Sequence, residues 1–365
     1  MTKPQEILIR GPNWTGDWIM ATPGFRALRA GFPEARITLA VRSGLEPLAT
    51  GAPWFDAVVP VSSYGHGALA LVREAKQLRG TRFDLGVCLP DSFSAALLMR
   101  LAGVREIIGY RRGWRRALLH RSVPLPSDGG RRLMLARELH VLGLVEALGC
   151  ARLGTDLELF VTAAEEREAH DRLDKDGIDP EQPYVVLAPG ASYGSSKCWP
   201  PASFAAVGDA LARAGARVVV VGTPAERELV GEVVSAMTER SVALAGELSL
   251  GGLKAVLRES KLLVCNDAGA RHLAVAFAVP CVVMMGSTSL EKTDLNLDRV
   301  QILTADVACR PCYKRECPID HRCMTRISPE HVTARALPAL ASDAAERWRG
   351  AQWVVREGGR LEAAA

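Results

Sequence analysis

Short apolar segments alternate with amphipathic ones along nearly the whole chain, and this alternation limits the folds that the chain can adopt. Strand character marks residues 6–10, 36–41, 83–89, 106–109, 184–188, 217–221, 261–265 and 280–285. Helical spacing marks 18–30, 92–102, 131–148, 202–214, 224–237, 250–259, 270–278, 331–340 and 342–348. Val218–Val221 is continuously apolar, which is typical of a strand covered by helices on both faces. The pattern predicts parallel α/β sheets built from right-handed strand–helix–strand crossovers.

One polar segment interrupts this pattern and marks a domain boundary. The charged helical stretch 163–176 is followed by Gly-Ile-Asp-Pro-Glu-Gln-Pro, which is dense in turn-forming residues. We therefore predict a first domain over 1–165, a linker over 166–183, a second domain over 184–345 and a fraying tail over 346–365. Both domains should be doubly wound and face a central cleft, and ligands of such sheets bind beyond the carboxyl ends of the strands.

Charge and hydropathy exclude two functional classes. The net charge of +4 over 365 residues is too low for a nucleic-acid binder. No apolar run reaches the roughly 20 residues that cross a bilayer. The first residues lead directly into a strand-like segment without a signal core, so we expect a cytoplasmic protein.

The loop after the first strand, Gly11-Pro-Asn-Trp-Thr-Gly-Asp17, places a carboxylate where a phosphate-binding loop requires lysine. Asp17 would repel a phosphate but suits a general base, because the start of a helix favours the anion. Asn13, Trp14 and Thr15 would then line the site. The alternative is that Asp17 only caps the helix or interacts with its dipole.

Three loops of the second half carry residues suited to an anionic, nucleotide-like ligand. The loop 189–200 is rich in Gly and Ser and presents Ser196 and Lys197. The turn Asn266-Asp-Ala-Gly-Ala-Arg-His272 offers free backbone N–H groups at a helix start, the usual site for a diphosphate. Glu226 follows another strand and suits ribose hydroxyls. Taken singly, a solvated Lys197, a capping Asp267 and a first-turn Glu226 are ordinary structural residues.

Together, these motifs resemble those of the bacterial lipopolysaccharide heptosyltransferases, glycosyltransferase family 9, and the cysteine-rich segment 309–324 is similar to that of the heptosyltransferase II branch. The resemblance covers residues 6 to about 345. It implies a GT-B fold of two Rossmann-like domains and inverting, metal-independent transfer of L-glycero-D-manno-heptose from ADP-heptose. The implied acceptor is the inner core of lipopolysaccharide, as heptosyl-Kdo2–lipid A. A monomer on the cytoplasmic face of the inner membrane is expected.

The resemblance also assigns roles to residues of this sequence. Asp17 matches the general base and Lys197 the lysine that steadies the diphosphate. Asp267, Gly269 and His272 match the donor motif, and Glu226 matches the ribose contact. Ala268 departs from the pattern, because the family commonly has Ser or Thr there, and we predict that Arg271 replaces the missing contact.

A basic stretch in the first half includes Arg111, Arg112 and Arg115, with Tyr110 and Trp114 interleaved. It suits a phosphorylated acceptor lipid and an anionic membrane surface. A solvated loop with ordinary arginines is the alternative.

The cysteine-rich segment contains Cys309, Cys312, Cys317 and Cys323. Four soft ligands so close together suit a structural zinc or an iron–sulfur cluster, whereas reduced thiols or labile disulfides are the alternative. No cofactor is expected in the reaction itself.

Other functions remain open at this level. They are heptosyltransferase I or another family 9 activity, a nucleotide-sugar epimerase of the same fold, and a non-catalytic metal-binding module.

Overall fold

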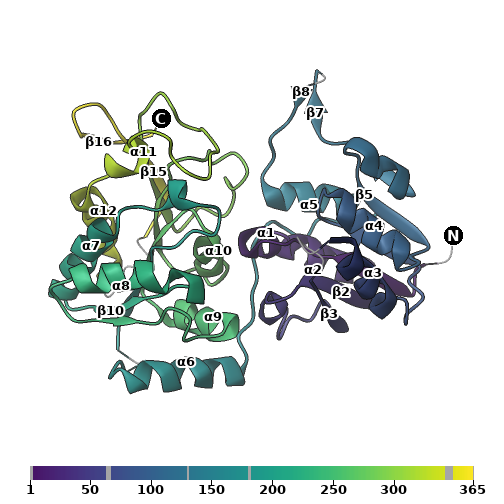
Figure 1. The fold of residues 1–365 in the computed structure, drawn as a ribbon, viewed down its shortest axis with the longest axis horizontal. Coiled ribbons are helices and arrows are strands. Elements are labelled where there is room, and N and C mark those ends of the chain that lie inside the picture. Colours follow the sequence, from purple (N-terminus) through teal and green to yellow (C-terminus); the bar gives the residue numbers. More distant parts are fainter. Residues whose placement is uncertain (1–2, 63–66, 130, 180–181, 342–347, 365) are drawn as a thin grey trace. The chain divides into compact units, whose positions relative to one another are not determined.

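The computed structural model describes residues 3–62, 67–129, 131–179, 182–341 and 348–364, which form two compact units (Figure 1). Unit 1 comprises Met1–Phe160 and Glu291–Leu295, and unit 2 comprises Val161–Leu290 and Asn296–Ala365. The division precedes the helix that we assigned largely to a linker. That helix, α6 (Ala163–Lys175), packs on α9 (Leu250–Glu259) within unit 2.

A buried ion pair explains why α6 belongs to unit 2 in spite of its charged sequence. The Lys254 side chain on α9 is fully buried, and its Nζ lies 2.9 Å from Oε1 of Glu165. Thr162 and Glu165 form a capping box that starts the helix. The domain boundary therefore lies earlier than the predicted linker, between Phe160 and Val161.

Unit 1 is built on a six-stranded parallel sheet with the order β3-β2-β1-β4-β5-β6. Its strands are β1 (Glu6–Arg10), β2 (Arg36–Arg42), β3 (Ala57–Val61), β4 (Leu85–Cys88), β5 (Glu106–Tyr110) and β6 (Arg121–Val123). Its helices are α1 (Thr15–Ile19), α2 (Thr22–Gly31), α3 (Gly67–Leu78), α4 (Phe93–Leu101) and α5 (Arg137–Glu146), with 3-10 turns η1 (Glu46–Leu48) and η2 (Gly113–Leu118). A two-stranded ribbon joins β7 (Ser127–Asp128) and β8 (Arg131–Arg132).

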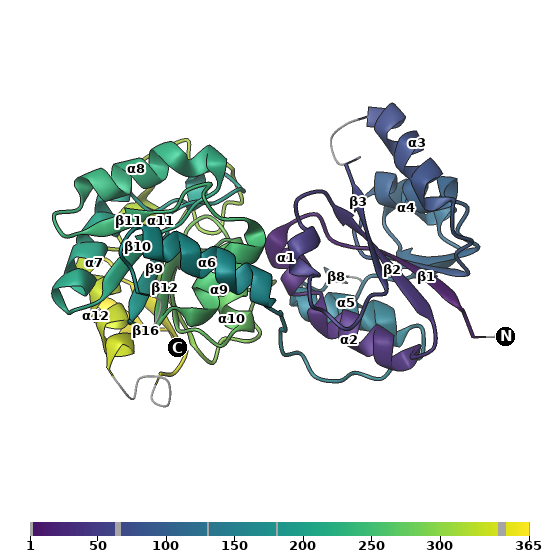
Figure 2. The same ribbon diagram turned by 90° about the horizontal axis from the view of Figure 1, so that it is seen from below.

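Helices cover both faces of this sheet. Helices α2 and α5 pack together on one face, and α3 and α4 pack together on the other (Figure 2). The strand order changes direction between β1 and β4, so the loops that follow these two strands flank the switch point of the sheet. The predicted single helix over 18–30 is two helices, because Pro23 lacks the N–H that a continuous helix would need and instead starts α2.

Unit 2 is built on an eight-stranded sheet with the order β11-β10-β9-β12-β13-β14-β15-β16. Its strands are β9 (Tyr184–Ala188), β10 (Arg217–Val220), β11 (Ser241–Ala243), β12 (Leu262–Asn266), β13 (Cys281–Met284), β14 (Val300–Ala305), β15 (Ala351–Val355) and β16 (Leu361–Ala363). Besides α6 and α9 its helices are α7 (Pro201–Arg213), α8 (Arg227–Ala236), α10 (Gly269–Ala276), α11 (Arg322–Thr325) and α12 (Pro329–Ala336), with 3-10 turns η3 (Ser195–Lys197), η4 (Pro224–Glu226) and η5 (Leu337–Leu340). The switch point lies between β9 and β12.

The predicted fraying tail over 346–365 is wrong where the structure describes it. Strand β15 pairs in parallel with β14, and β16 pairs antiparallel with β15. Val355 is fully buried and belongs to the hydrophobic core of unit 2. The predicted helix over 342–348 lies almost wholly outside the described residues. Within the described ranges, no helix combines the length and apolar content needed to span a bilayer.

Candidate functional site

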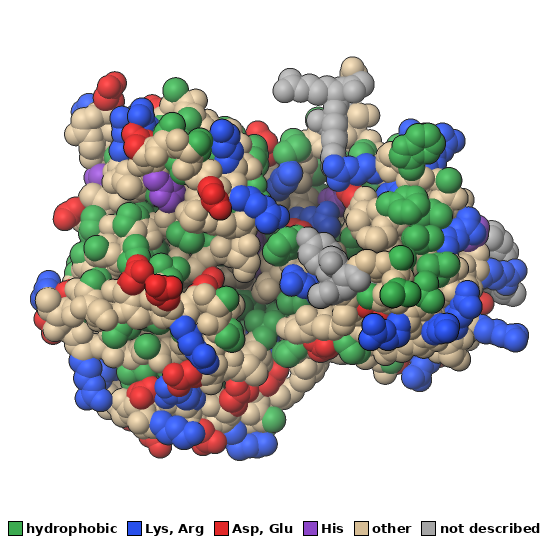
Figure 3. Space-filling model, in the orientation of Figure 1, with side chains coloured by type: hydrophobic (Ala, Val, Ile, Leu, Met, Phe, Trp, Pro, Cys, Tyr) green, Lys and Arg blue, Asp and Glu red, His purple; other side chains and the backbone are tan. Residues whose placement is uncertain are grey.

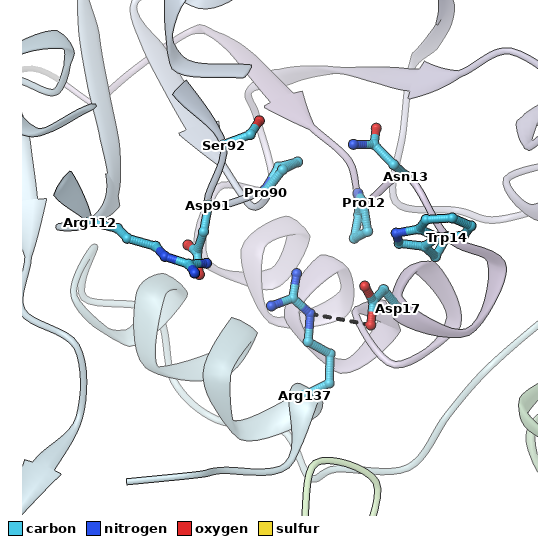
Figure 4. Close-up of a pocket in the computed structure, with 9 residues that line it drawn as sticks. All are labelled: Pro12, Asn13, Trp14, Asp17, Pro90, Asp91, Ser92, Arg112 and Arg137. Atoms are coloured by element: carbon cyan, nitrogen blue, oxygen red, sulfur yellow. Dashed lines mark ion pairs between the residues drawn. The ribbon is translucent and has the colours of Figure 1, made fainter. Parts of the chain in front are cut away.

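A pocket in unit 1 lies at the switch point of the first sheet (Figure 4). Its volume is about 440 Å³, and it is lined by Pro12, Asn13, Trp14, Asp17, Pro90, Asp91, Ser92, Arg112 and Arg137. One part of the lining follows β1 and another follows β4. This is the position at which doubly wound sheets bind ligands.

Asp17 faces this pocket with 38% of its side chain exposed. Its Oδ1 lies 3.8 Å from Nε of Arg137, which projects from α5 (Figure 4). The N-cap of α1 is Trp14, which makes no side-chain capping hydrogen bond, so Asp17 is not the cap of its helix. The geometry therefore excludes the capping role, whereas Asp17 does lie in the first turn of α1, where a carboxylate interacts favourably with the helix dipole. Its role toward a ligand stays a prediction.

The residues predicted to line the site beside Asp17 do not all line the pocket. Asn13 and Trp14 line the pocket, whereas Thr15 begins α1 and is not among the lining residues. The Asn13 carbonyl accepts a hydrogen bond from Nη1 of Arg42 at 3.1 Å, and the same guanidinium lies 5.8 Å from the centroid of the Trp14 ring. These contacts fix the loop against β2.

The predicted basic stretch divides into three environments. Arg112 lines the pocket, and Arg111 is exposed just after β5 without lining it. Arg115 is buried, and its Nη1 donates to the Pro90 carbonyl at 2.7 Å and lies 3.3 Å from Oδ1 of Asp91. Arg115 therefore holds the pocket wall in place from behind and does not face the ligand space.

Asp91 is a second pocket carboxylate that sequence analysis did not single out. Its Oδ2 lies 3.6 Å from Nε2 of His140. Burial alone would raise the pKa of Asp91, but the nearby His140 ring and two guanidinium groups outweigh it and lower the pKa. The pocket thus holds two carboxylates, Asp17 and Asp91. The available signal was a carboxylate in the short loop after an apolar strand, separated from β4 by Leu89 and Pro90.

In unit 2, Lys197 and Asp267 meet at the switch point of the second sheet. Lys197 follows β9 and Asp267 follows β12. Lys197 Nζ donates to Oδ2 of Asp267 at 2.6 Å and to the carbonyl of the same residue at 2.9 Å. Two motifs that lie far apart in the sequence therefore form one side-chain cluster.

Asp267 is the centre of this cluster. Thr288 Oγ1 donates to its Oδ2 at 2.9 Å, and Arg271 Nη1 donates to its Oδ1 at 3.2 Å. Burial would raise the pKa of Asp267, but the charges of Lys197 and Arg271 hold that pKa well below its usual range. The carboxylate is therefore ionised at any physiological pH. Thr288 is a further residue of this cluster that no sequence motif indicated.

Arg271 and His272 differ from what their sequence positions indicated. Arg271 is 1% exposed and pairs with Asp267, so its position supports a role in holding that carboxylate. Contact between Arg271 and a donor remains a prediction. Burial, followed by the charge of Arg271, lowers the pKa of His272 to about 3. His272 is consequently neutral at pH 7 and offers hydrogen bonds without a positive charge.

Ala268 and Gly269 form the start of α10. Ala268 is the N-cap in an extended conformation with no side-chain capping bond, and Gly269 is the first helical residue. The first N–H groups of a helix have no partner within the helix and attract anions. Because position 268 lacks a hydroxyl, the backbone N–H groups are the donors that this turn offers to an anion.

Asn266 ties the loop 189–200, which we call the lysine loop because it carries Lys197, to the sheet. Its Nδ2 donates to the Pro189 carbonyl at 2.7 Å, and its Oδ1 accepts from Trp199 N at 3.0 Å. The loop that carries Lys197 is thus held at both ends by one fully buried amide. Glu226 lies over the same loop, because a Cβ added to Gly190 would come within 2.0 Å of its Oε1. Gly190 therefore allows Glu226 to approach the lysine loop.

Ser196 is buried beneath the cysteine-rich segment and does not face open space. Its N donates to the Arg315 carbonyl at 3.0 Å, and its Oγ donates to Oγ of Ser287 at 3.0 Å. Nε2 of His321 lies 2.9 Å from the Ser196 carbonyl. The segment 309–323 therefore packs directly on the loop that carries Lys197. Ser196 supports this loop, and its predicted contact with a donor remains untested.

The four cysteines of this segment do not form a metal site in the structure. Cys309 and Cys312 are exposed, Cys317 is half-buried, and Cys323 is buried in the hydrophobic core of unit 2. Burial raises the pKa of the Cys323 thiol to about 11, so this thiol is protonated at pH 7. Within the part of the chain that the structure describes, no three His, Cys, Asp or Glu side chains are grouped to hold a metal ion. The arrangement is that of free thiols.

Comparisons with known proteins show the family to which the chain belongs. The model of glycosyltransferase family 9 (heptosyltransferase) matches residues 71–322. Lipopolysaccharide heptosyltransferase 2 of Escherichia coli K12 is 30% identical over 302 residues, which cover 79% of this chain and 84% of that protein. The chain belongs to glycosyltransferase family 9.

Solved structures show the fold of this family 9 glycosyltransferase. The structure of E. coli ADP-heptose lps heptosyltransferase II matches with a TM-score of 0.76 at 24% identity, covering 94% of this chain and 99% of that one. E. coli heptosyltransferase WaaC with ADP-2-deoxy-2-fluoro heptose matches with a TM-score of 0.67 at 16% identity, covering 90% and 98%. The predicted GT-B fold, with two doubly wound Rossmann-like domains, is confirmed.

Proposed function

We propose that this family 9 enzyme transfers L-glycero-D-manno-heptose from ADP-heptose to the inner core of lipopolysaccharide, with inversion at the anomeric carbon. The preferred acceptor is heptosyl-Kdo2–lipid A, which makes this the second heptose of the core. The names of the E. coli and Salmonella typhimurium relatives, both lipopolysaccharide heptosyltransferase 2, support this choice. The observation that carries the chemistry is the half-exposed Asp17 carboxylate in the pocket of unit 1.

Asp17 is the general base of the proposed reaction. The acceptor hydroxyl oxygen forms a bond to the anomeric carbon of the heptose while its proton passes to the Asp17 carboxylate. The bond between the anomeric carbon and the β-phosphate oxygen breaks, and its electron pair leaves with ADP. Arg137, 3.8 Å from Asp17, orients the carboxylate before the reaction. Arg112, which lines the same pocket, binds anionic groups of the acceptor.

Lys197 balances the charge that develops on the leaving diphosphate. Its side chain is 14% exposed and its ammonium group is held by Asp267, so it is positioned in advance. The N–H groups at the start of α10 add neutral donors for the same oxygens. Glu226 accepts hydrogen bonds from ribose hydroxyls in this proposal, in addition to those that its Oε2 accepts from the N–H and Oγ1 of Thr223 in a capping box. We propose that these protein groups replace a metal ion, and that neither a metal nor an organic cofactor takes part.

The enzyme acts as a monomer on the cytoplasmic face of the inner membrane, without a nucleic-acid partner. An acceptor anchored by acyl chains requires this peripheral position, because its reactive sugar lies at the level of the lipid headgroups.

An ADP-release assay tests the proposal. Purified enzyme receives ADP-heptose with Kdo2–lipid A that carries zero, one or two heptoses. Turnover only with the one-heptose acceptor supports the assignment. Preference for the heptose-free acceptor would indicate a first-heptose activity. Turnover of a UDP-sugar without an acceptor would indicate an epimerase, and failure with every nucleotide sugar would favour a binding module.

Asp17→Asn tests the base within the same assay. We expect kcat to fall by about 10²–10⁴-fold while ADP-heptose binding is unchanged, because the amide cannot take the proton. Glu34→Gln, at an exposed position of unit 1, is the matched control and should retain activity. Wild-type turnover by Asp17→Asn would refute the role of Asp17.

A further inference from the structure

The face of unit 1 that carries α3, α4 and η2 exposes large hydrophobic side chains. Trp114 on η2 is 90% exposed, Leu69 on α3 is 85% exposed, and Phe93 at the start of α4 is 51% exposed. Val72, one turn after Leu69, is also exposed. We call these four residues the hydrophobic patch. Side chains of this size are usually buried, so their exposure on neighbouring elements indicates an interaction surface.

The elements that carry the patch are packed together. Helix α3 packs against α4, and α4 packs against η2. Arg100 Nε on α4 donates to the Leu118 carbonyl at the end of η2, with a distance of 2.9 Å. In Figure 3, hydrophobic side chains gather over α4 and η2, and Lys and Arg side chains border them. The patch is therefore a fixed surface of unit 1.

Positive charge surrounds the patch. Residues 67–78, 93–101 and 111–118 contain seven Lys or Arg residues and a single acidic residue, Glu74. Arg115 is buried and pairs with Asp91, and the other six cations are exposed. Glu74 is buried and accepts a hydrogen bond from Ser62 N, so its charge does not face outward. Arg73, Lys76 and Arg116 are exposed among or beside the hydrophobic residues. The surface thus combines exposed apolar side chains with positive charges that no exposed acidic side chain of these three segments neutralises.

We propose that this surface docks the enzyme on an anionic phospholipid bilayer, with Trp114 and Phe93 entering the interface. Tryptophan favours the interface because its ring is both apolar and polar, and each basic residue near an anionic surface adds attraction. A second copy of the chain is a poor occupant, because it would bring the same cations face to face.

The patch borders the pocket, which gives docking a role in acceptor delivery. Phe93 directly follows Ser92, a lining residue, and Trp114 follows Arg112, another lining residue, by two positions. Docking therefore places the mouth of the pocket near the headgroup layer. A sugar acceptor that is anchored by acyl chains reaches Asp17 without leaving the membrane. This role rests on the proposed function, whereas bilayer binding itself does not.

Vesicle sedimentation tests the docking. The full-length enzyme should bind phosphatidylcholine vesicles that contain about 30% phosphatidylglycerol, and the bound fraction should fall as salt screens the charges. Phe93→Ser and Trp114→Ser should each weaken this binding by about tenfold or more, because each removes a large apolar contact with the bilayer. Leu153→Ser, at a residue of unit 1 that is 45% exposed, is the matched control and should bind as the wild type does.

Charge-reversal variants and an activity measurement complete the test. Arg116→Glu should weaken binding to the anionic vesicles, whereas Arg36→Glu, at an exposed position at the opposite end of the sheet, should have a smaller effect. Trp114→Ser should raise KM about tenfold for an acceptor embedded in vesicles and leave transfer to the same oligosaccharide without acyl chains unchanged.

Two outcomes would overturn the docking surface. One is a wild-type enzyme that does not bind the anionic vesicles, and the other is a Phe93→Ser/Trp114→Ser enzyme that binds them as the wild type does. If the wild type transfers heptose to neither acceptor, the proposed function fails while the vesicle measurements still decide the docking.

Discussion

Replacing Asp267 by Asn should destabilise unit 2 more than the removal of a charge from an exposed ion pair does. The carboxylate is buried and receives hydrogen bonds from Lys197, Arg271 and Thr288. Arg271 is itself 1% exposed, so the amide would remove the negative charge that this buried guanidinium faces. Loss of one partner from a buried ion pair costs about 3–5 kcal/mol of the free energy of unfolding. We expect Asp267→Asn to fall in that range.

A double-mutant cycle separates this effect from a general loss of packing. Arg271→Met removes the buried charge and keeps an apolar side chain of similar length, and Asp267 retains Lys197 at 2.6 Å. The double variant should therefore be more stable than the sum of the single changes predicts, by about 1–3 kcal/mol. Glu239→Gln, which breaks an exposed pair with Arg213 at 3.2 Å, is the control and should cost less than about 1 kcal/mol.

Urea denaturation and hydrogen exchange of peptides from β12 and α10 measure these free energies within the full-length chain. A loss below about 1 kcal/mol for Asp267→Asn, or strict additivity with Arg271→Met, would refute the reasoning. Either result would mean that water or a shift of the lysine loop compensates the guanidinium.

Other predictions concern the lysine loop and its neighbours. Lys197→Met should weaken ADP binding about tenfold in calorimetry and lower kcat as well, because the diphosphate loses its ammonium partner; unchanged values would place the donor elsewhere. Gly194 has a φ of +149°, and a Cβ there would lie 2.3 Å from the Arg315 carbonyl oxygen. Gly194→Ala should therefore lower donor affinity by displacing the loop, and a wild-type affinity would contradict that. His272 is neutral in the fold, with a pKa lowered to about 3, whereas the unfolded chain takes up a proton near pH 6.5. The free energy of unfolding should accordingly fall by up to about 1.4 kcal/mol for each pH unit below 6.5, and His272→Gln should flatten this dependence between pH 6.5 and 4 in acid-dependent denaturation. An equal slope in both proteins would exclude His272 as its source.

Continuous apolar strands made the core of both sheets predictable. The segments 6–10 and 184–188 match β1 and β9. A parallel strand that is buried on both faces is a continuous apolar run, so its ends can be located in the sequence. Strands β3 and β14 were missed. The first contains Pro60, and the second mixes Gln301 and Thr304 with its apolar residues. Pairing with neighbouring strands stabilises both, and that information is absent from local pattern.

Residues of the candidate site could be selected from the sequence where they lie in a recognisable motif. They could not be selected where only the fold brings them together. Asp17, Lys197 and Asp267 lie in Gly-containing turns after strands, and the structure brings Lys197 and Asp267 into contact. Asp91 and Thr288 stand in no such motif, and only the strand order brings them to the switch points. The pairing of buried Arg271 with Asp267 was not predicted, because burial of a guanidinium cannot be recognised without the packing around it. Contact between Arg271 and a donor stays a prediction.

The last strands of the chain have a practical consequence for handling the protein. Strand β15 covers the edge of β14, and β16 covers β15. A chain shortened before Ala351 would leave β14 with open N–H and C=O groups, and such edges pair with other molecules and promote aggregation. Shortened versions should therefore precipitate during production even though Asp17, Lys197 and Asp267 are intact. Fusion partners are better attached beyond Ala363 than in place of these strands.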